Sequence, residues 1–154
     1  MPPLILFEGD FQKYIDLIYQ EFVDSILYSK LTFQGLPVRP RYQPEYNGKE
    51  LGFWHMTSTG EKEEEREPDI RRCERIKWLR WVIENHTNPA ISSWKETRAG
   101  VTEVVLWVEQ EQYVVVLSER RDYWLLKTAY LATRSGKIRQ LTNSRARNTP
   151  PQKS

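Results

Sequence analysis

The sequence predicts an α+β domain in which an N-terminal helix and a second helix pack on one face of a twisted antiparallel β-sheet. Apolar residues recur every three or four positions over residues 10–30 and 68–86, as on one face of a helix. Over residues 91–132 the chain changes to Val-, Leu- and aromatic-rich runs separated by the short polar turns EQEQ and ERRD. Short connections imply antiparallel neighbours, so these runs predict a β-meander.

The first part of the chain predicts one helix, two strands and two loops. Asp10 is placed to cap the N-terminus of the helix, and the Asn47-Gly48 pair is a strong turn signal. The expected elements are a helix over 10–30, a short strand over 30–38 ended by Pro37, a loop over 39–50, a strand over 51–59 and a charged loop over 60–67.

The second helix follows the charged loop. Pro68 suits its first position, and Asp69 suits the positive end of its dipole. Its apolar stripe consists of Ile70, Cys73, Ile76, Leu79 and Ile83. Its other faces carry an unusual density of basic residues, namely Arg71, Arg72, Arg75, Lys77 and Arg80.

Composition and charge predict one globular domain with a basic tail. A chain of 154 residues falls in the usual range for a single domain. The net charge is only +2, but acidic residues gather over 61–67, while the segment from Arg134 to the end carries basic residues and no acid. We therefore expect a domain over residues 1–135 and a basic, partly disordered tail over 136–154 that can follow a phosphate backbone.

The compartment is predicted from cysteine content and hydropathy. The single cysteine, Cys73, cannot form a disulfide within the chain, and no thiol cluster exists for zinc. The N-terminal MPPLILFEGD lacks the basic leader of a signal peptide, and no run of about 18 apolar residues occurs. We expect a soluble cytoplasmic protein with no membrane partner.

Candidate functional residues come from three predicted elements. The chain has no Gly-rich phosphate loop, no GxSxG elbow and no HExxH motif, so we expect a site without metal or cofactor. Alternation along the last strand places Thr128 and Tyr130 on one face and Lys127 on the other. His55 on a neighbouring strand and arginines of the second helix would complete the site.

This set of groups matches the needs of RNA cleavage by internal transesterification. That reaction requires a base, cationic groups to stabilise the phosphorane, and an acid for the leaving 5′-oxygen. His55 can be the base or the acid. Arg72, Arg75 and Lys127 can bind phosphate. Thr128 and Tyr130 can hold the phosphate or orient the base.

Each candidate also has a structural interpretation. A histidine between Trp54 and Met56 is commonly a hydrogen-bonded structural residue, and an arginine run on a helix is commonly a solvated face. Two further functions stay open. One is a non-catalytic RNA-binding or phage accessory protein, and the other is a partner-binding subunit that uses its acidic 61–67 loop.

The final strand, YWLLKTAYLAT, resembles the last-strand "llkTAY" motif of the barnase–EndoU–colicin–RelE superfold of metal-independent ribonucleases. The matching residues are Leu125, Leu126, Lys127, Thr128, Ala129 and Tyr130. The segment GFWHMTS, followed by a helix that opens with PDIRRCERI and ends near Trp81, is similar to a branch linked to phages and mobile elements. The resemblance covers residues 50–135.

The resemblance implies an RNA endonuclease, often directed at tRNA or the ribosome, that acts as a toxin and is restrained by an immunity protein or antitoxin. It implies that Thr128 and Tyr130 form the last-strand polar site and that His55 is a strand-borne base. The candidate catalytic residues are therefore His55, Arg72, Arg75, Thr128 and Tyr130. The candidate substrate-binding residues are Arg71, Lys127, Arg134 and Arg139. RNA is favoured over DNA because the substrate's own 2′-OH is the nucleophile.

Overall fold

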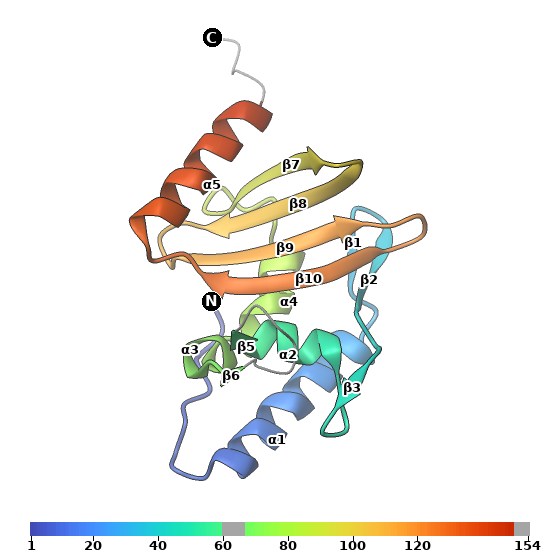
Figure 1. Cartoon of the computed structure of the whole chain (residues 1–154), viewed down its shortest axis with the longest axis vertical. Coiled ribbons are helices and arrows are strands. Elements are labelled where there is room, and N and C mark those ends of the chain that lie inside the picture. Colours follow the sequence, from blue (N-terminus) through green and yellow to red (C-terminus); the bar gives the residue numbers. More distant parts are fainter. Residues whose placement is uncertain (60–66, 150–154) are drawn as a thin grey trace.

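The computed structural model describes residues 1–59 and 67–149 and confirms an α+β fold (Figure 1). Its main sheet has six strands in the order β1-β2-β10-β9-β8-β7. Most of the acidic loop and the last residues of the predicted tail, 60–66 and 150–154, lie outside the described residues.

Four consecutive strands form the predicted meander. They are β7 (Ser92–Arg98), β8 (Val101–Val108), β9 (Tyr113–Glu119) and β10 (Trp124–Leu131), and each pairs antiparallel with the next. Apolar side chains are buried on both faces in β8 and β9, which is why their sequences are nearly continuous runs of valine and leucine. This part of the sheet agrees with the sequence prediction.

The fifth and sixth strands make the sheet mixed rather than purely antiparallel. The hairpin of β1 (Thr32–Phe33) and β2 (Leu36–Pro40) joins it through β2, which lies parallel to β10. Because β2 and β10 are far apart in the sequence, the short turns between consecutive strands could not predict that they pair. Pro37 was expected to end a strand but lies inside β2, where its partner is Thr32 of β1, before the pairing with β10 begins at Val38.

The predicted N-terminal helix is α1 (Phe11–Phe22), continued by a π-helix, η1 (Val23–Leu27). The carboxylate of Asp10 caps α1 by accepting a hydrogen bond from the backbone N–H of Lys13 at 3.1 Å. The residues that α1 buries in the core, beside the neighbouring helices, are Tyr14, Ile15, Ile18 and Phe22.

The second predicted helix is present but is interrupted at Arg75. It forms α3 (Ile70–Glu74) and α4 (Ile76–Glu84). Asp69 caps α3 by accepting hydrogen bonds from the backbone N–H groups of Arg71 at 3.0 Å and Arg72 at 3.4 Å. Cys73 and the later residues of the predicted apolar stripe are buried, so the two short helices still present one continuous face to the core.

The strand predicted over residues 51–59 was wrong, because most of this segment is the helix α2 (Leu51–Thr57). Only Ser58–Thr59 is extended, as β5, and it pairs with β6 (Glu67–Pro68). A short apolar run does not distinguish a buried helix from a strand. Ahead of α2, β3 (Glu45–Tyr46) and β4 (Lys49–Glu50) form a hairpin. Its turn is the predicted Asn47-Gly48 pair, with φ of 53° and 74°.

Much of the predicted basic tail forms a fourteen-residue helix, α5 (Ser135–Asn148), which the sequence did not predict. The helix buries only Leu141 and Ser144, so it has no apolar stripe that sequence periodicity could reveal. Figure 1 shows α5 lying across one end of the sheet, away from the other helices.

The sheet separates two hydrophobic clusters. On the side covered by α1 to α4, here called the helix side, a large core includes Phe22, Phe53, Leu79, Leu106 and Leu126. On the opposite side, the α5 side, a smaller cluster comprises Trp94, Val105, Trp107, Val114, Val116, Ala132 and Leu141. Neighbouring residues such as Leu106 and Trp107 belong to different clusters because side chains alternate along a strand. Over residues 1–59 and 67–149, no helix is both long enough and apolar enough to cross a bilayer.

Close backbone contact between α2 and the end of β2 provides a stability test. The N–H of Gly52 donates to the carbonyl oxygen of Arg41 at 2.8 Å. A Cβ at Gly52 would lie 2.7 Å from the Cβ of Pro40 and 2.8 Å from the backbone nitrogen of Arg41. We expect Gly52→Ala to lower the free energy of unfolding in urea by about 1–3 kcal/mol, because the helix must move away.

The matched control is Gly136→Ala in α5, where nothing lies within 4 Å of an added Cβ. Alanine there should stabilise the protein by up to about 1 kcal/mol through its higher helix propensity. Equal stability of the two variants would contradict the close packing of α2 against β2.

Candidate functional site

A β-bulge in β10 shapes the α5 side of the sheet. Leu126 pairs with Leu117 and Thr128 pairs with Val116, so Lys127 is an extra residue opposite the β9 ladder. The extra residue shifts the alternation of side chains by one position. As a result Lys127 and Thr128 both line a pocket on the α5 side, whereas simple alternation predicted opposite faces.

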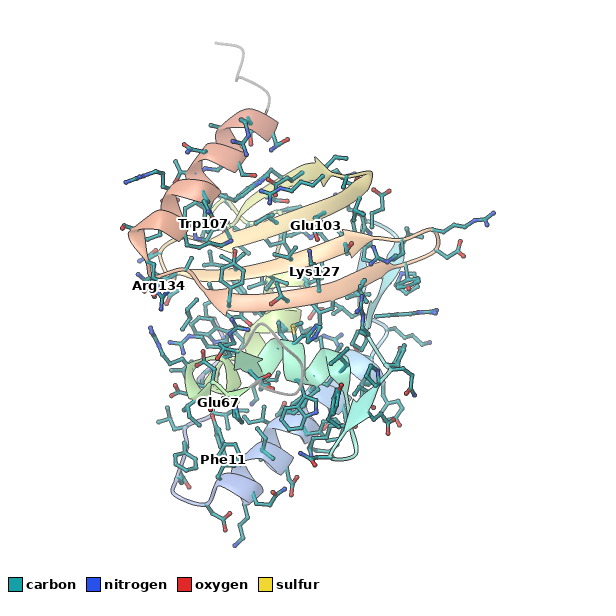
Figure 2. The ribbon with its side chains drawn as sticks, viewed as in Figure 1. Phe11, Glu67, Glu103, Trp107, Lys127 and Arg134 are labelled. Carbon is teal, nitrogen blue, oxygen red and sulfur yellow. The ribbon has the colours of Figure 1, made fainter. Side chains whose placement is uncertain are left out.

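This pocket, here called the sheet-face pocket, has a volume of about 410 Å³ and lies between the sheet and α5. Strands β7, β8, β9 and β10 supply its floor, and α5 supplies one wall. Its charged side chains are Glu96, Arg98, Glu103, Lys127, Lys137 and Arg147, four basic groups against two carboxylates. Figure 2 shows Glu103 and Lys127 on the part of the sheet that α5 leaves open.

The two carboxylates are direct cross-strand partners, because Glu96 of β7 pairs with Glu103 of β8. Like charges in this arrangement destabilise a sheet. Each of the two carboxylates is therefore paired with a basic side chain. Nη2 of Arg98 lies 2.8 Å from Oε1 of Glu96, and Nζ of Lys127 lies 2.5 Å from Oε2 of Glu103. The side chains of Glu96 and Glu103 are only 13% and 18% exposed, so neither charge is dispersed into solvent.

Glu96 also connects the sheet to α5. The hydroxyl of Ser144 donates to Oε1 of Glu96 at 2.9 Å, and Nε1 of Trp94 donates to Ser144 at 2.9 Å. Burial raises the pKa of Glu96. Hydrogen bonds from Arg98 and Ser144, with the charges of Arg98 and Arg147, outweigh burial and hold the pKa below its ordinary value. Glu96 is therefore an ionised anchor for the basic groups around it.

Tyr130 is a neutral phenol at the side of the pocket. Its ring packs with the α5-side cluster, and Nζ of Lys137 lies 5.1 Å from the ring centroid. Burial raises the pKa of Tyr130 to about 12, although the positive charge of Arg72 opposes this rise. The hydroxyl thus keeps its proton at neutral pH and can act as a hydrogen-bond or proton donor.

Three of the sequence-predicted site residues meet in the sheet-face pocket: Lys127, Thr128 and Tyr130. His55, Arg72 and Arg75 are not among its lining residues, because α2, α3 and α4 cover the helix side of the sheet. His55 was expected on a strand but belongs to α2. The sheet-face pocket therefore contains the last-strand part of the predicted site, and the proximity of His55 to Thr128 stays a prediction.

The helix-side arginines make structural contacts. Nη1 of Arg72 donates to the carbonyl oxygens of Ser58 at 2.9 Å and His55 at 3.4 Å, which ties α3 to the end of α2. Nη1 of Arg75 donates to the carbonyl oxygen of Arg71 at 2.8 Å, and its guanidinium carbon lies 5.1 Å from the ring centroid of Trp78.

The remaining predicted substrate-binding residues are exposed. Arg71 is on α3 and Arg139 is on α5. Arg134, just before α5, lines a shallow pocket with Tyr130 and Lys137 and so borders the sheet-face pocket.

Sequence reasoning missed Glu96, Arg98 and Glu103, although the chain contains a signal for them. Glu96 and Glu103 are equidistant from the two-residue turn Ala99-Gly100, whose φ angles are 50° and 78°. In a hairpin with a two-residue turn, equidistant residues face each other. Recognising this turn would have placed both carboxylates on one face. Lys137 and Arg147 could be placed in the pocket only by knowing that the tail forms a helix against the sheet.

The described residues contain no group of three or more His, Cys, Asp or Glu side chains that could hold a metal ion. Comparisons with protein-family models, with curated proteins and with solved structures gave no match to this chain. The candidate site is therefore defined by its geometry and charge.

The lowered pKa of Glu96 predicts how stability depends on pH. A carboxyl group with a lower pKa in the folded state contributes stability above its unfolded pKa, whose ordinary value is 4.5. That contribution is lost as the pH falls through the lower, folded value. We expect the free energy of unfolding of the wild type to decrease below about pH 4.5 more steeply than that of Glu96→Gln, measured in urea.

The control for this measurement is Glu111→Gln, in the exposed turn between β8 and β9. Its pH dependence should follow that of the wild type. If Glu96→Gln and the wild type lose stability in parallel on acidification, the hydrogen-bonded anchor has no energetic role.

Proposed function

We propose that this protein cleaves RNA in the sheet-face pocket by attack of the substrate's own 2′-OH on the adjacent phosphate, without a metal ion. The observation that carries the proposal is the cross-strand pair Glu96 and Glu103, held on an accessible sheet face among four basic side chains. A pair of like charges costs stability in a sheet, so its presence in a pocket is typical of a functional site.

Glu103 is the proposed base. The pKa of Glu96 is lowered, so Glu96 is a weak proton acceptor and serves to hold Arg98 and Ser144 in place. Glu103 lies in the part of the pocket shared by β8 and β10, with Lys127 in contact. An incoming phosphate can attract Lys127 and free the Glu103 carboxylate to accept the proton of the 2′-OH.

The basic groups are suited to a phosphodiester. Four cations against two carboxylates leave a net charge of +2, which attracts phosphate and stabilises the phosphorane. The guanidinium groups of Arg98 and Arg147 can bind phosphate oxygens in pairs, and the ammonium groups of Lys127 and Lys137 act as point charges.

Tyr130 is the proposed acid for the leaving 5′-oxygen. Its raised pKa, about 12, keeps it protonated at neutral pH. Thr128, which lines the same pocket, is positioned to donate a hydrogen bond to the phosphate. General acid–base catalysis contributes about 10²–10⁴ in rate, and each positioned donor about 10²–10³, so both effects are needed.

The last-strand motif supports assigning the chain to the barnase–EndoU–colicin–RelE ribonucleases, and this assignment is part of the proposal. The proposed base is Glu103 and not His55, because His55 belongs to α2, which packs on the helix side of the sheet. A tRNA substrate, an antitoxin or immunity partner, and a toxin role in a phage stay predictions of the resemblance.

One observation favours a second candidate function, RNA binding without cleavage. Both carboxylates are already engaged, Glu96 by Arg98 and Ser144 and Glu103 by Lys127. A pocket in which every carboxylate is neutralised would bind an RNA phosphate without activating the 2′-OH of the adjacent ribose. The third hypothesis, a partner bound by the acidic loop, concerns residues that lie almost entirely outside the described part of the chain.

Cleavage is tested with Glu103→Gln, which preserves the shape of the side chain and removes the base. Wild-type protein incubated with RNA in EDTA should generate fragments with 2′,3′-cyclic phosphate ends. We expect Glu103→Gln to lower kcat/KM by about 10²–10⁴, since the proton acceptor is lost. The readout is the fragment yield on a denaturing gel, with end groups identified by mass spectrometry.

Glu111→Gln is the control, because it removes one carboxylate from an exposed turn. Intact RNA after long incubation with folded wild type would favour the binding function. A larger loss of activity in His55→Ala than in Glu103→Gln would place the site on the helix side and contradict the proposed base.

A substitution of Tyr130 tests the proposed acid. Tyr130→Phe removes only the hydroxyl, so the ring should keep its contacts with the α5-side cluster and with Lys137. We expect kcat to fall by about 10²-fold while KM changes little, because the lost donor acts at the leaving oxygen. An RNA analogue with a good leaving group in place of the 5′-oxygen should be cleaved by Tyr130→Phe and wild type at similar rates.

A further inference from the structure

A second pocket opens on the same side of the sheet and adjoins the sheet-face pocket. It has a volume of about 370 Å³ and shares Arg98, Glu103 and Lys127 with its neighbour. Arg41 and Arg120 belong to this second pocket alone, so we call it the arginine pocket. The shared residues make the two pockets one continuous depression that crosses the sheet from α5 toward β2.

The arginine pocket has a larger excess of positive charge than the sheet-face pocket. Four basic residues line it, Arg41, Arg98, Arg120 and Lys127, with Glu103 as the single carboxylate. Glu103 is neutralised by Lys127 at 2.5 Å. The pocket thus has strong attraction for an anion but contains no second carboxylate to serve as a base.

The two arginines specific to this pocket are positioned by the fold. Nη1 of Arg120 donates to Oγ of Ser118 at 2.6 Å and to the carbonyl oxygen of Glu119 at 3.1 Å, which fixes its guanidinium over the end of β9. The backbone of Arg41 is held by the N–H of Gly52 at 2.8 Å. Between them Leu125 of β10 supplies an apolar floor and is 7% exposed.

We propose that the arginine pocket binds a backbone phosphate of single-stranded RNA, next to the phosphate held in the sheet-face pocket. The choice of RNA as ligand rests on the proposed function. Phosphates of one strand can enter two adjoining depressions when the strand bends along them, as in positively charged grooves for single strands. A rigid A-form duplex presents its phosphates on a convex surface and does not enter both pockets.

The test measures binding independently of cleavage. The probe is a pool of random-sequence 2′-O-methyl RNA decamers labelled with fluorescein, which have no free 2′-OH and cannot be cleaved. Fluorescence anisotropy gives Kd over a series of salt concentrations for the wild type and for Arg41→Gln/Arg120→Gln. We expect about a tenfold weaker Kd for the double variant and a log–log salt slope shallower by about 0.7, the value for one lost phosphate contact on a single strand.

The matched control is Lys13→Gln/Lys30→Gln, which removes the same net charge from exposed positions outside both pockets. Its salt slope should equal that of the wild type. Far-ultraviolet circular dichroism and thermal melting confirm that each variant is folded. The single variants Arg41→Gln and Arg120→Gln give intermediate affinities if both guanidinium groups contact the same phosphate.

Cleavage of RNA by the wild type, measured separately, distinguishes this inference from the proposed function. Weaker binding by the arginine variant with no cleavage by the wild type supports the arginine pocket and contradicts the nuclease. Cleavage by the wild type with equal binding by wild type and variant contradicts the arginine pocket and supports the nuclease. Failure of the wild type to bind the decamers overturns the inference.

Discussion

Two negative charges held opposite each other are the constraint that organises the α5 side of the sheet. The turn at Ala99 and Gly100 fixes the register that makes Glu96 and Glu103 partners. Because neither side chain is well exposed, their repulsion must be balanced by protein groups. Arg98 performs this role for Glu96 within its own strand, and Lys127 does so for Glu103 from β10. The polar surface of the sheet is therefore an electrostatic unit built from residues of several strands.

The sheet keeps this unit apart from the main core. Leu106 and Leu126 face the helices, while Trp107 and Lys127 face the opposite side. The large apolar core under α1 and α4 can thus carry most of the stability, while the polar face tolerates paired charges that would be costly inside a core. The bulge at Lys127 adds to this separation, because it gives the polar face two consecutive side chains without disturbing the core contacts of Ala129.

The α+β class, the first helix and the meander could be predicted from the sequence because each depends on a local pattern. Ile18 and Phe22 repeat with helical spacing, and the strands from Trp94 onward are separated by short turns. The site could be predicted only in part. Thr128 and Tyr130 share a face by simple alternation, but Lys127 joins them only through the bulge. The strand expected around His55 was wrong because a seven-residue segment that is only largely apolar, LGFWHMT, fits either structure.

The α5 wall has a consequence for the order in which the charges are assembled. During synthesis from the N-terminus, Glu96 and Glu103 are made well before Ser144 and Arg147. Every residue of the helix-side core precedes α5, yet the Glu96 carboxylate depends on the hydroxyl and the guanidinium of that last helix. A chain truncated before Ser135 would therefore retain the residues of its apolar core but leave the negative charge of Glu96 only partly balanced.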